Sequence, residues 1–468
     1  MKHHSIPIYF AAALVCGLAP LKADGHRNVL LIVSDDLTSR LGCYGYSLVD
    51  SAHLDRLAQQ GVRFERAYCQ YPLCNPSRAS FMTGRRPRTT GVTENKTHFR
   101  AALPDVTTLP QLFQKHGYFT ARAGKIFHYG VPSQIGTSGF DDPPSWQTVR
   151  NPKGRDRIHQ DQVINLTPQF SLGIALGYLA DDGHDADQTD AMVATEAIRL
   201  MAENKDRPFF IAAGFFRPHV PSVAPKRYFD LYDLNDVELP QLPPDDRPAF
   251  PPAAHDYFPP HYGLEPEKLR IFTRAYLATI SFMDAQVGRL IEALDQLNLA
   301  DTTIVVFLSD HGWLLGEHGG QWQKRSLFEE SARVPLIIYA PNAKGNGMAC
   351  PRTVELVDLF PTLSEWCDLP RPSGLEGTSL VPLLEHPDRP WSKPAITEVV
   401  RRKNRSIRHG IHGRSVRTER YRYTEWDHGT KGTELYDHHH DPNEWFNLAA
   451  DPNFKETITR LRTLFPGE

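Results

Sequence analysis

The chain has 468 residues, of which 23% are charged and 40% hydrophobic, with a formal net charge of -3. This length exceeds one ordinary domain and predicts one large domain with a smaller companion. A net charge so close to zero gives no long-range field for nucleic acid or an anionic membrane, so both are excluded as expected partners. Any specificity for an anion must therefore be local.

The N-terminus has the pattern of a secretory signal peptide over residues 1–23. Lys2 begins a short basic segment, residues 6–21 are apolar, and the small residue Ala23 ends the stretch. The apolar run is shorter than the ~20 residues that span a bilayer, and no other run approaches that length, so we expect no membrane span. We therefore expect a periplasmic or secreted protein. A lipoprotein anchor at Cys16 is disfavoured because the bulky Val15 precedes it.

Short apolar runs alternate with helical patterns through the next 340 or so positions. β-branched, continuously apolar runs predict strands buried on both faces of a parallel sheet, at residues 28–34, 118–123, 209–213, 303–308 and 336–339. Helical spacing predicts helices at residues 53–60, 109–115, 187–203, 268–297 and 354–366. Alternating strands and helices predict a large α/β/α sandwich with a mostly parallel central sheet.

Two long segments lack either pattern. Residues 130–183 are polar and irregular, and residues 230–266 are dense in proline, so both are expected to form loops that wall a ligand pocket. Composition changes again near residue 385. We expect a large domain over 24–385 and a small α+β domain over 386–468, with an antiparallel sheet, short alternating runs such as 415–423, and a last helix near 454–464.

Residues 74–85 read C-N-P-S-R-A-S-F-M-T-G-R and place a cysteine on a Pro-Ser-Arg turn just before a helix. Backbone N–H groups and the helix dipole favour negative charge there, and Arg78 lies one turn further on, so the position suits a sulfate or phosphate. The alternative is an ordinary helix start with Cys74 as a buried thiol or half of a disulfide. The remaining cysteines after cleavage, Cys43, Cys69, Cys350 and Cys367, allow three pairings or none.

This run resembles the maturation motif of the type I sulfatases, within the alkaline phosphatase superfamily. The resemblance implies that a formylglycine-generating maturation enzyme oxidises Cys74 to Cα-formylglycine. It also implies that the aldehyde hydrates to a geminal diol, one hydroxyl of which attacks the sulfur of a sulfate ester. A second hydroxyl then allows the sulfate to be expelled, which an ordinary serine could not provide.

Acidic residues follow two of the predicted strands. Asp35 and Asp36 end the first, and Asp310 and His311 follow the run at 303–308, so they are expected at the same edge of the sheet. Carboxylate oxygens with one imidazole favour a hard divalent cation. The resemblance implies Ca²⁺ held by these four residues and an oxygen of residue 74, with Mg²⁺ or Mn²⁺ left open by the ligand types.

The remaining candidate residues lie in short segments just past predicted strands. G-K-I-F-H, R-P-H-V-P, S-D-H-G-W and G-E-H-G together resemble the iduronate-2-sulfatase branch. The resemblance implies that Arg78, Lys125 and Lys324 bind the sulfate oxygens, that His219 with Lys324 protonates the leaving sugar oxygen, and that His128 takes a proton from residue 74.

Two more residues are candidates for substrate binding. Arg217 stands where the iduronate enzymes carry a lysine, and it keeps a cation for a substrate carboxylate. Trp322 either stacks on a sugar ring or packs internally, with equal expectation. His438, His439 and His440 are expected to form a turn, because three consecutive residues cannot converge on one ion.

The expected function is therefore hydrolysis of a sulfated carbohydrate, with a 2-O-sulfated uronic acid at a non-reducing end favoured by the iduronate-like segments. One alternative is a hydrolase of phosphate or phosphonate esters that uses the same nucleophile. The other is a non-catalytic binder of sulfated glycans in which Cys74 stays a thiol.

Overall fold

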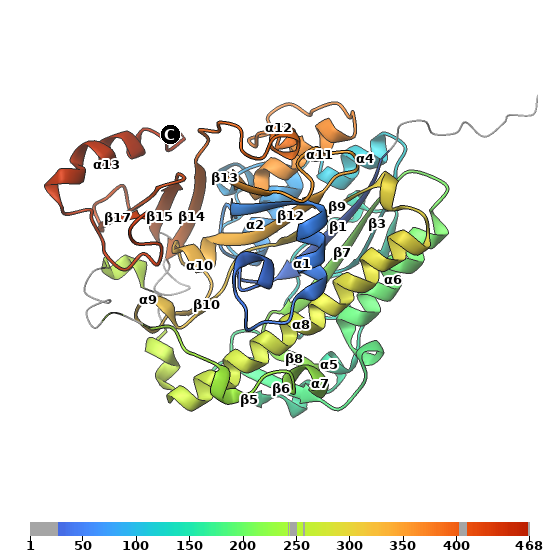
Figure 1. Cartoon of the computed structure of the whole chain (residues 1–468), viewed down its shortest axis with the longest axis horizontal. Helices are drawn as coiled ribbons and strands as arrows, with labels where there is room; N and C mark the ends of the chain where they lie inside the picture. Colours follow the sequence, from blue (N-terminus) through green and yellow to red (C-terminus); the bar gives the residue numbers. More distant parts are fainter. Residues whose placement is uncertain (1–26, 242, 244–249, 256–257, 402–409, 467–468) are drawn as a thin grey trace, which may run out of the picture.

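The computed structural model describes residues 27–241, 243, 250–255, 258–401 and 410–466. The expected signal peptide over residues 1–23, with Cys16, lies outside the described residues. Figure 1 shows a large domain built around a twisted sheet and, to its left, a small C-terminal subdomain. Within the described residues, no helix is both long enough and apolar enough to cross a bilayer.

The central sheet has eight strands in the order β13-β2-β12-β9-β1-β7-β3-β4. β1 lies in the middle and runs parallel to both of its neighbours, β7 and β9, whereas β12 is antiparallel to β9 and β2. The mostly parallel sheet is thus confirmed. Its strands are β1 (Asn28–Asp35), β2 (Val62–Tyr68), β3 (Phe119–Gly124), β4 (Thr148–Arg150), β7 (Phe209–Pro218), β9 (Thr303–Ser309), β12 (Arg333–Tyr339) and β13 (Ala349–Glu355).

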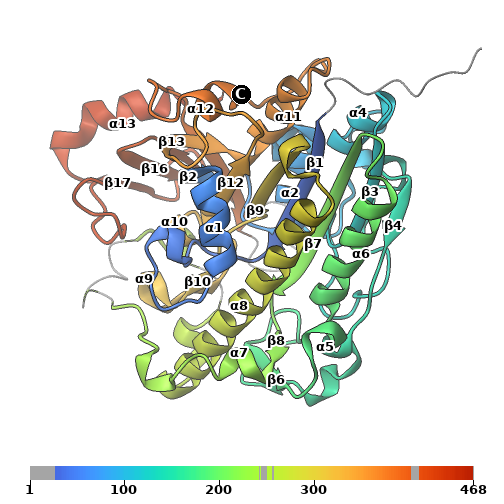
Figure 2. The ribbon, with the colours of Figure 1, turned by 45° about the vertical axis from the view of Figure 1, so that its right-hand side comes forward.

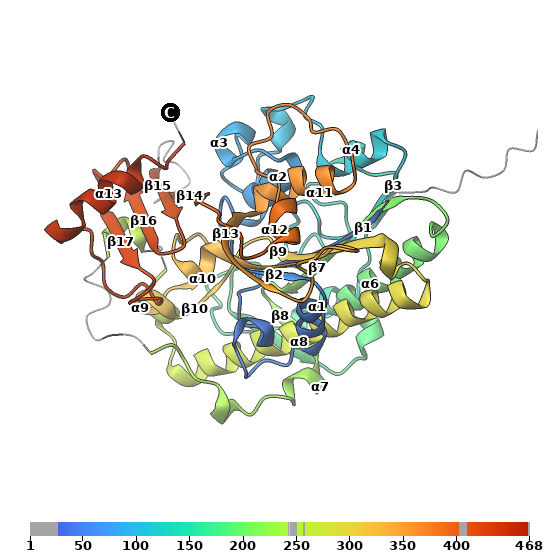
Figure 3. The ribbon, with the colours of Figure 1, turned by 45° about the horizontal axis from the view of Figure 1, so that its top comes forward.

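Helices cover both faces of this sheet. Alternate residues of β1 enter two separate cores: Leu30 and Ile32 pack with α1 (Ala52–Gln60), α6 (Thr189–Glu203) and α8 (Pro266–Gln296). Val29, Leu31 and Val33 pack with α2 (Cys74–Thr83), α4 (Leu109–Lys115) and α11 (Leu359–Trp366). Figure 2 shows the first helical layer in front of the sheet, and Figure 3 shows the two layers on opposite sides. The α/β/α sandwich follows from this alternation, because successive strand residues point to opposite faces.

Two of the expected elements need correction. The helix predicted over 354–366 begins only at Leu359, because Val354 and Glu355 complete β13 by pairing with Ala67 and Tyr68 of β2. Residues 130–183 are also less irregular than expected. They contain α5 (Arg155–Ile158) and the strands β5 (Ile164–Asn165) and β6 (Gly177–Asp181), and β6 pairs with the distant β8 (Ser222–Pro225).

The C-terminal subdomain is an antiparallel sheet with a helix beside it (Figure 3), as expected. Its elements are β14 (Ala395–Arg401), β15 (Ile411–Arg417), β16 (Tyr421–Trp426), β17 (Thr433–Asp437) and α13 (Lys455–Arg462). The alternating run at 415–423 spans the β15–β16 hairpin rather than a single strand. The short elements elsewhere are α3 (Pro87–Thr90), α7 (Lys226–Phe229), α9 (Glu317–Gly320), α10 (Glu329–Ala332), α12 (Val381–Glu385), β10 (Leu314–Leu315) and β11 (Trp322–Gln323).

The described cysteines form no disulfide bond. Cys43, Cys69, Cys350 and Cys367 are all unpaired, so none of the three possible disulfide pairings forms there. Burial raises the pKa of Cys69 and, together with the nearby Asp55 carboxylate, that of Cys43. These thiols therefore stay protonated and lack the reactivity of a thiolate.

Candidate active site

The candidate site lies at the carboxyl ends of β1 and β9. These strands are parallel neighbours in register, with Ser34 opposite Ser309, so the residues that follow them meet at one edge of the sheet. Asp36 adopts a positive φ of 65°, and its N–H donates a 3.2 Å hydrogen bond to Oδ1 of Asp310. The two acidic segments predicted from the sequence are thereby brought together.

Cys74 is the first residue of α2 and is completely buried. Its Sγ lies 3.2 Å from Nζ of Lys324, 3.4 Å from Nε2 of His311 and 3.9 Å from Oδ1 of Asp36. Ser77, one turn further on, donates a short hydrogen bond to the carbonyl of Asp310. The start of the helix is thus fixed directly against the acidic cluster.

Arg78 holds the carboxylates in place. It is fully buried, its Nε donates to Oδ2 of Asp310 at 2.7 Å, and one Nη lies 3.3 Å from Oδ1 of Asp35. Its other Nη donates to the carbonyls of Lys125 and Ile126 at 2.6 and 3.0 Å. A planar guanidinium suits this arrangement because its donors are fixed in a fork.

Two lysines supply further positive charge. Lys125 forms a short ion pair with Oδ2 of Asp35, and Nζ of Lys324 lies 2.7 and 2.9 Å from the two carboxylate oxygens of Asp36. Both side chains are buried, at 0 and 8% exposure. Cations held this close to residue 74 can neutralise an anion that enters the site.

Two histidines complete the group of predicted catalytic residues. Nε2 of His219 lies 3.6 Å from Oδ2 of Asp36, while its Nδ1 lies 2.6 Å from the carbonyl of Val220. That carbonyl fixes the proton on Nδ1 and leaves Nε2 towards the site. His128, which is 9% exposed, lies close enough to Cys74 to lower the pKa of its thiol.

The charges shift the pKa values in this cluster. Burial alone would raise the pKa of Cys74, but Lys125, Lys324 and His311 lower it well below the ordinary value of a thiol. Burial disfavours a charged His311, yet the neighbouring Asp310 and Asp36 carboxylates raise its pKa to about 9. Burial also lowers the pKa of His128, so its imidazole is neutral near pH 7 and able to accept a proton.

The buried donor set fits a divalent cation. Asp35, Cys74, Asp310 and His311 each place a ligand atom within 4.8 Å of the others, and Asp35, Asp36, Cys74 and His219 form a second such set. Burial raises the pKa of Asp310 to about 6, against the opposing charge of Arg78. Several buried carboxylates at one point are otherwise costly, and oxygen-rich sites of this kind favour hard cations.

Two expected substrate contacts are not supported by the structure. Arg217 is 1% exposed, and its guanidinium donates to Asp156 at 2.7 Å and to the carbonyls of His219 and Pro221 at 3.1 and 2.7 Å. Trp322 is 2% exposed and packs edge-on against Phe272. Arg217 therefore braces the segment that carries His219, and Trp322 belongs to the core.

Sequence reasoning missed several residues that support the site. Asp190 accepts hydrogen bonds from the backbone N–H groups of Phe216 and Arg217 at 2.8 and 2.9 Å. The Tyr276 hydroxyl donates to the carbonyl of Asp36 at 2.7 Å. An isolated Asp or Tyr within a helical pattern carries no local signal of such a role. The turn expected at His438–His440 is present, following β17.

Comparison with known proteins places this geometry in context. Residues 27–369 match a family model described as "Sulfatase", and residues 316–465 match one described as "N-sulphoglucosamine sulphohydrolase, C-terminal". A "Sulfatase" of Formosa agariphila is 33% identical, over 94% of this chain and 86% of the relative. The iduronate 2-sulfatase of Mus musculus is 33% identical, over 89% of this chain and 88% of the relative.

Solved structures agree with the fold. A structure described as a 2-O GAG sulfatase has a TM-score of 0.71 at 24% identity, covering 94% of this chain and 91% of that chain. The phosphonate monoester hydrolase of Agrobacterium radiobacter has a TM-score of 0.75 at 25% identity, covering 94% of this chain and 95% of that chain.

Proposed function

The chain belongs to the sulfatase family and hydrolyses sulfate esters, and from that premise we propose that its substrate is a saccharide carrying a 2-O-sulfated uronic acid. We further propose that residue 74 acts as Cα-formylglycine beside a bound Ca²⁺. The observation that carries this proposal is the position of Cys74. It begins a buried helix, and its sulfur lies within 3.4 Å of both Lys324 and a predicted metal ligand, His311.

The residues present fit both groups. Asp35, Asp36, Asp310 and His311 would hold the cation together with the side chain of residue 74. When present, the metal and the hydrated aldehyde supply positive charge and an oxygen nucleophile for the sulfate ester. The site tolerates an anion because Lys125 and Lys324 already face Cys74, which supports an oxygen-rich side chain at that position.

The protein's own residues then perform three tasks. Lys125 and Lys324 bind the sulfate oxygens and offset the charge that grows in the transition state, while Arg78 keeps both carboxylates fixed. His219 presents Nε2 to the departing sugar oxygen and donates a proton to it. Neutral His128, close to residue 74, accepts a proton from that side chain.

The preference for a uronic acid rests on the iduronate-like segments and on the iduronate 2-sulfatase relatives. It does not rest on Arg217, because that guanidinium is already bound within the protein. We propose that the protein is exported through a signal peptide over residues 1–23, matured by a formylglycine-generating enzyme, and divided into domains at residues 24–385 and 386–468.

A second candidate function is hydrolysis of phosphonate or phosphate monoesters. The observation in its favour is the similarity to the Agrobacterium phosphonate monoester hydrolase, at 25% identity over nearly the whole chain. Arg78, Lys125 and Lys324 would offset the charge of either tetrahedral anion.

The test gives the matured protein three substrates. They are a uronate–glucosamine disaccharide sulfated at O2 of the uronate, the same disaccharide sulfated instead at O6 of the glucosamine, and a phosphonate monoester. The proposal expects sulfate release from the first at a kcat/KM at least ~10²-fold above the others, a typical margin for a site built around one polar arrangement. Removal of metal with a chelator should abolish release, and Ca²⁺ should restore it. Preferential cleavage of the phosphonate would favour the second candidate.

A further inference from the structure

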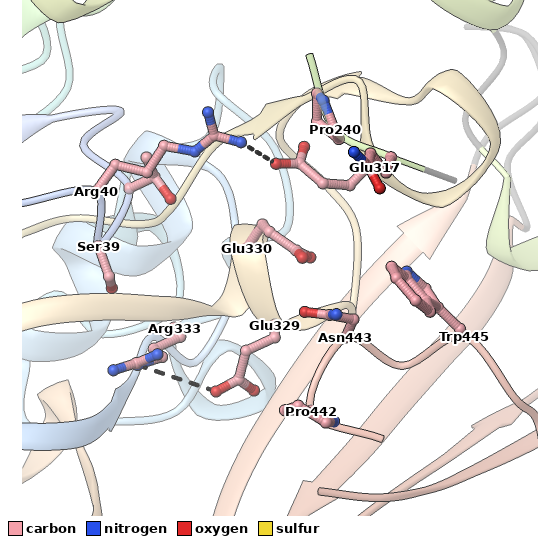
Figure 4. Close-up of a pocket in the computed structure, with 12 residues that line it drawn as sticks. Ser39, Arg40, Pro240, Glu317, Glu329, Glu330, Arg333, Pro442, Asn443 and Trp445 are labelled. Carbon is pink, nitrogen blue, oxygen red and sulfur yellow. Dashed lines mark hydrogen bonds and ion pairs between the residues drawn. The ribbon is translucent and has the colours of Figure 1, made fainter. Parts of the chain in front are cut away.

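Two adjoining cavities follow the seam between the large domain and the C-terminal subdomain. Their volumes are about 480 and 530 Å³, and both are lined by Glu329, Arg333 and Pro442, so they form one continuous groove. Figure 4 shows the first cavity, into which the large domain and the C-terminal subdomain both contribute side chains. None of the predicted catalytic residues, and none of the metal ligands predicted after β1 and β9, lines this seam groove. Each cavity has the size of an ordinary ligand site.

One end of the seam groove holds arginines whose ion pairs are long, exposed to solvent or, among the described residues, absent. The side chain of Arg333 is 28% exposed and donates no hydrogen bond within the described part of the chain. Its Nε lies 4.0 Å from Oε1 of Glu329, which also accepts a hydrogen bond from the Tyr68 hydroxyl at 2.8 Å. Oε2 of Glu329 pairs with Arg417 and Arg422. Glu329 is thus shared among three arginines, and Arg333, which lines the groove, is held only by its long contact.

Arg66 adds to this positive charge. Its guanidinium forms a short hydrogen bond to the carbonyl of Pro351 and, among the described residues, no ion pair. Arg63 also lines this end, and it pairs with Glu65 at 3.2 Å, with the two side chains 27 and 37% exposed. An exposed pair of this kind contributes little, so a ligand anion can compete for it. The end defined by Arg63, Arg66 and Arg333 is thus suited to a sulfate or carboxylate group.

The other end suits a sugar ring. Trp445 is partly exposed, and it lines the cavity beside Asn443 and across from Glu330 (Figure 4). An indole face binds the apolar face of a pyranose, while amide and carboxylate groups take hydrogen bonds from its hydroxyls. Weakly paired cations at one end and an aromatic face with polar groups at the other match a single kind of ligand, an acidic oligosaccharide.

We propose that the seam groove binds a sulfated oligosaccharide segment, and so anchors a polysaccharide away from the bond that is cut. The identity of the polymer as a sulfated glycan rests on the proposed function. The groove begins at Thr38, two residues after Asp36, so an anchored chain is held close to the catalytic edge of the sheet. Anchoring lowers KM for long substrates and leaves the chemistry of short ones unchanged.

The experiment measures binding of a fluorescent heparin octasaccharide to the full matured protein, at two salt concentrations. The Arg66→Ala/Arg333→Ala double variant should bind it about tenfold more weakly at low salt, and its affinity should depend less on salt. Arg199→Ala is the matched control, because Arg199 is 58% exposed on α6, away from the groove. The control should bind like the unchanged protein, and all three should hydrolyse 4-nitrophenyl sulfate at the same kcat/KM.

Trp445→Ala provides an independent variant if the double variant melts at a lower temperature, since a partly exposed indole supports little of the fold. It should weaken octasaccharide binding as well. The proposal is overturned if Trp445→Ala and a folded double variant both bind the octasaccharide with unchanged affinity. It is also overturned if these variants lose no more affinity than the Arg199→Ala control. A protein that binds the octasaccharide through these residues but releases no sulfate would contradict the proposed function and leave the groove intact.

Discussion

At the scale of single residues, the site is organised around the side chain of residue 74. Cys74 sits among buried cations that lower its pKa, whereas burial raises the pKa of Cys69, another buried thiol nearby in the chain. Lys125 lowers the pKa of Cys74 most, followed by Lys324, whose Nζ lies 3.2 Å from the sulfur. Only one of these two cysteines is therefore placed to carry an anionic reaction.

Replacing Cys74 should separate chemistry from folding. Cys74→Ala should lower sulfate release by at least ~10³-fold, because the nucleophile is removed. Cys69→Ala is a matched control, because Cys69 is as buried as Cys74. Per folded molecule, this variant should keep the activity of the unchanged protein. In Cys74→Ser, the hydroxyl should accept sulfate once and then stop, which intact-protein mass spectrometry would detect. Steady turnover by Cys74→Ser would refute the need for a second hydroxyl.

The two histidines should respond differently to the leaving group. His219→Asn should lower kcat by about 10²–10⁴-fold on a sugar sulfate, the usual contribution of a positioned acid, and far less on 4-nitrophenyl sulfate, whose leaving group needs no proton. His128→Asn should lower both, because its proton transfer involves residue 74 rather than the leaving oxygen. Equal losses on both substrates in His219→Asn would contradict the assignment of the acid.

At the scale of elements, the segment after β7 shows how a loop is braced for catalysis. Arg217, near the end of β7, binds two carbonyls of the loop that follows, and Asp156 and Asp190 hold it from α5 and α6. These contacts connect positions 61 and 27 residues apart in the sequence. His219 is thereby oriented from a distance.

Arg217→Lys tests whether this residue positions His219 or binds substrate. A lysine keeps the charge but cannot span Asp156 and both carbonyls, so kcat should fall by about tenfold. The loss should be the same for substrates with and without a carboxylate, and Asp156→Asn should reproduce it. A rise in KM confined to uronic-acid substrates would show instead that Arg217 meets the substrate.

The attachment of the C-terminal subdomain is also electrostatic. Arg422 of β16 is 1% exposed and bridges Glu329 of α10 and Glu444, each through a short ion pair. Burial alone would raise the pKa of Glu444, but Arg422 and His438 lower it to about 2. Breaking such a buried pair leaves an uncompensated charge.

This pair predicts a dependence of stability on acid. The folded pKa of Glu444 lies below its ordinary value of 4.5, so its stabilisation is complete above pH 4.5 and is lost as the pH falls towards 2. Glu444→Gln should lower the free energy of unfolding by ~3 kcal/mol at pH 7. The variant should also lose less stability than the unchanged protein as the pH falls from 4.5 to 2. Thermal melting across that range measures both effects. Glu419→Gln serves as control, because Glu419 is only partly buried and its ion pair with Arg352 is accessible to solvent. A Glu444→Gln protein as stable as this control would contradict the account.

At the scale of the whole molecule, local patterns predicted the sandwich because each buried strand is a continuous apolar run. The metal-binding candidates after β1 and β9 were predicted for the same reason, since parallel strands bring their carboxyl ends together. Pairing between distant segments leaves no such pattern. The local pattern predicted a helix at Val354, whereas in the structure this residue pairs with β2. Likewise, no local pattern indicated that Asp156 binds the guanidinium of Arg217.

The most direct test of the central claim compares sulfate release with the state of residue 74 in the same sample. Preparations made with and without a formylglycine-generating enzyme would be assayed on the 2-O-sulfated disaccharide, and mass spectrometry of the peptide across residue 74 would give the fraction converted. The account predicts that kcat rises in proportion to the converted fraction and extrapolates to zero when no residue 74 is converted. Full activity in protein whose Cys74 is entirely unconverted would contradict it.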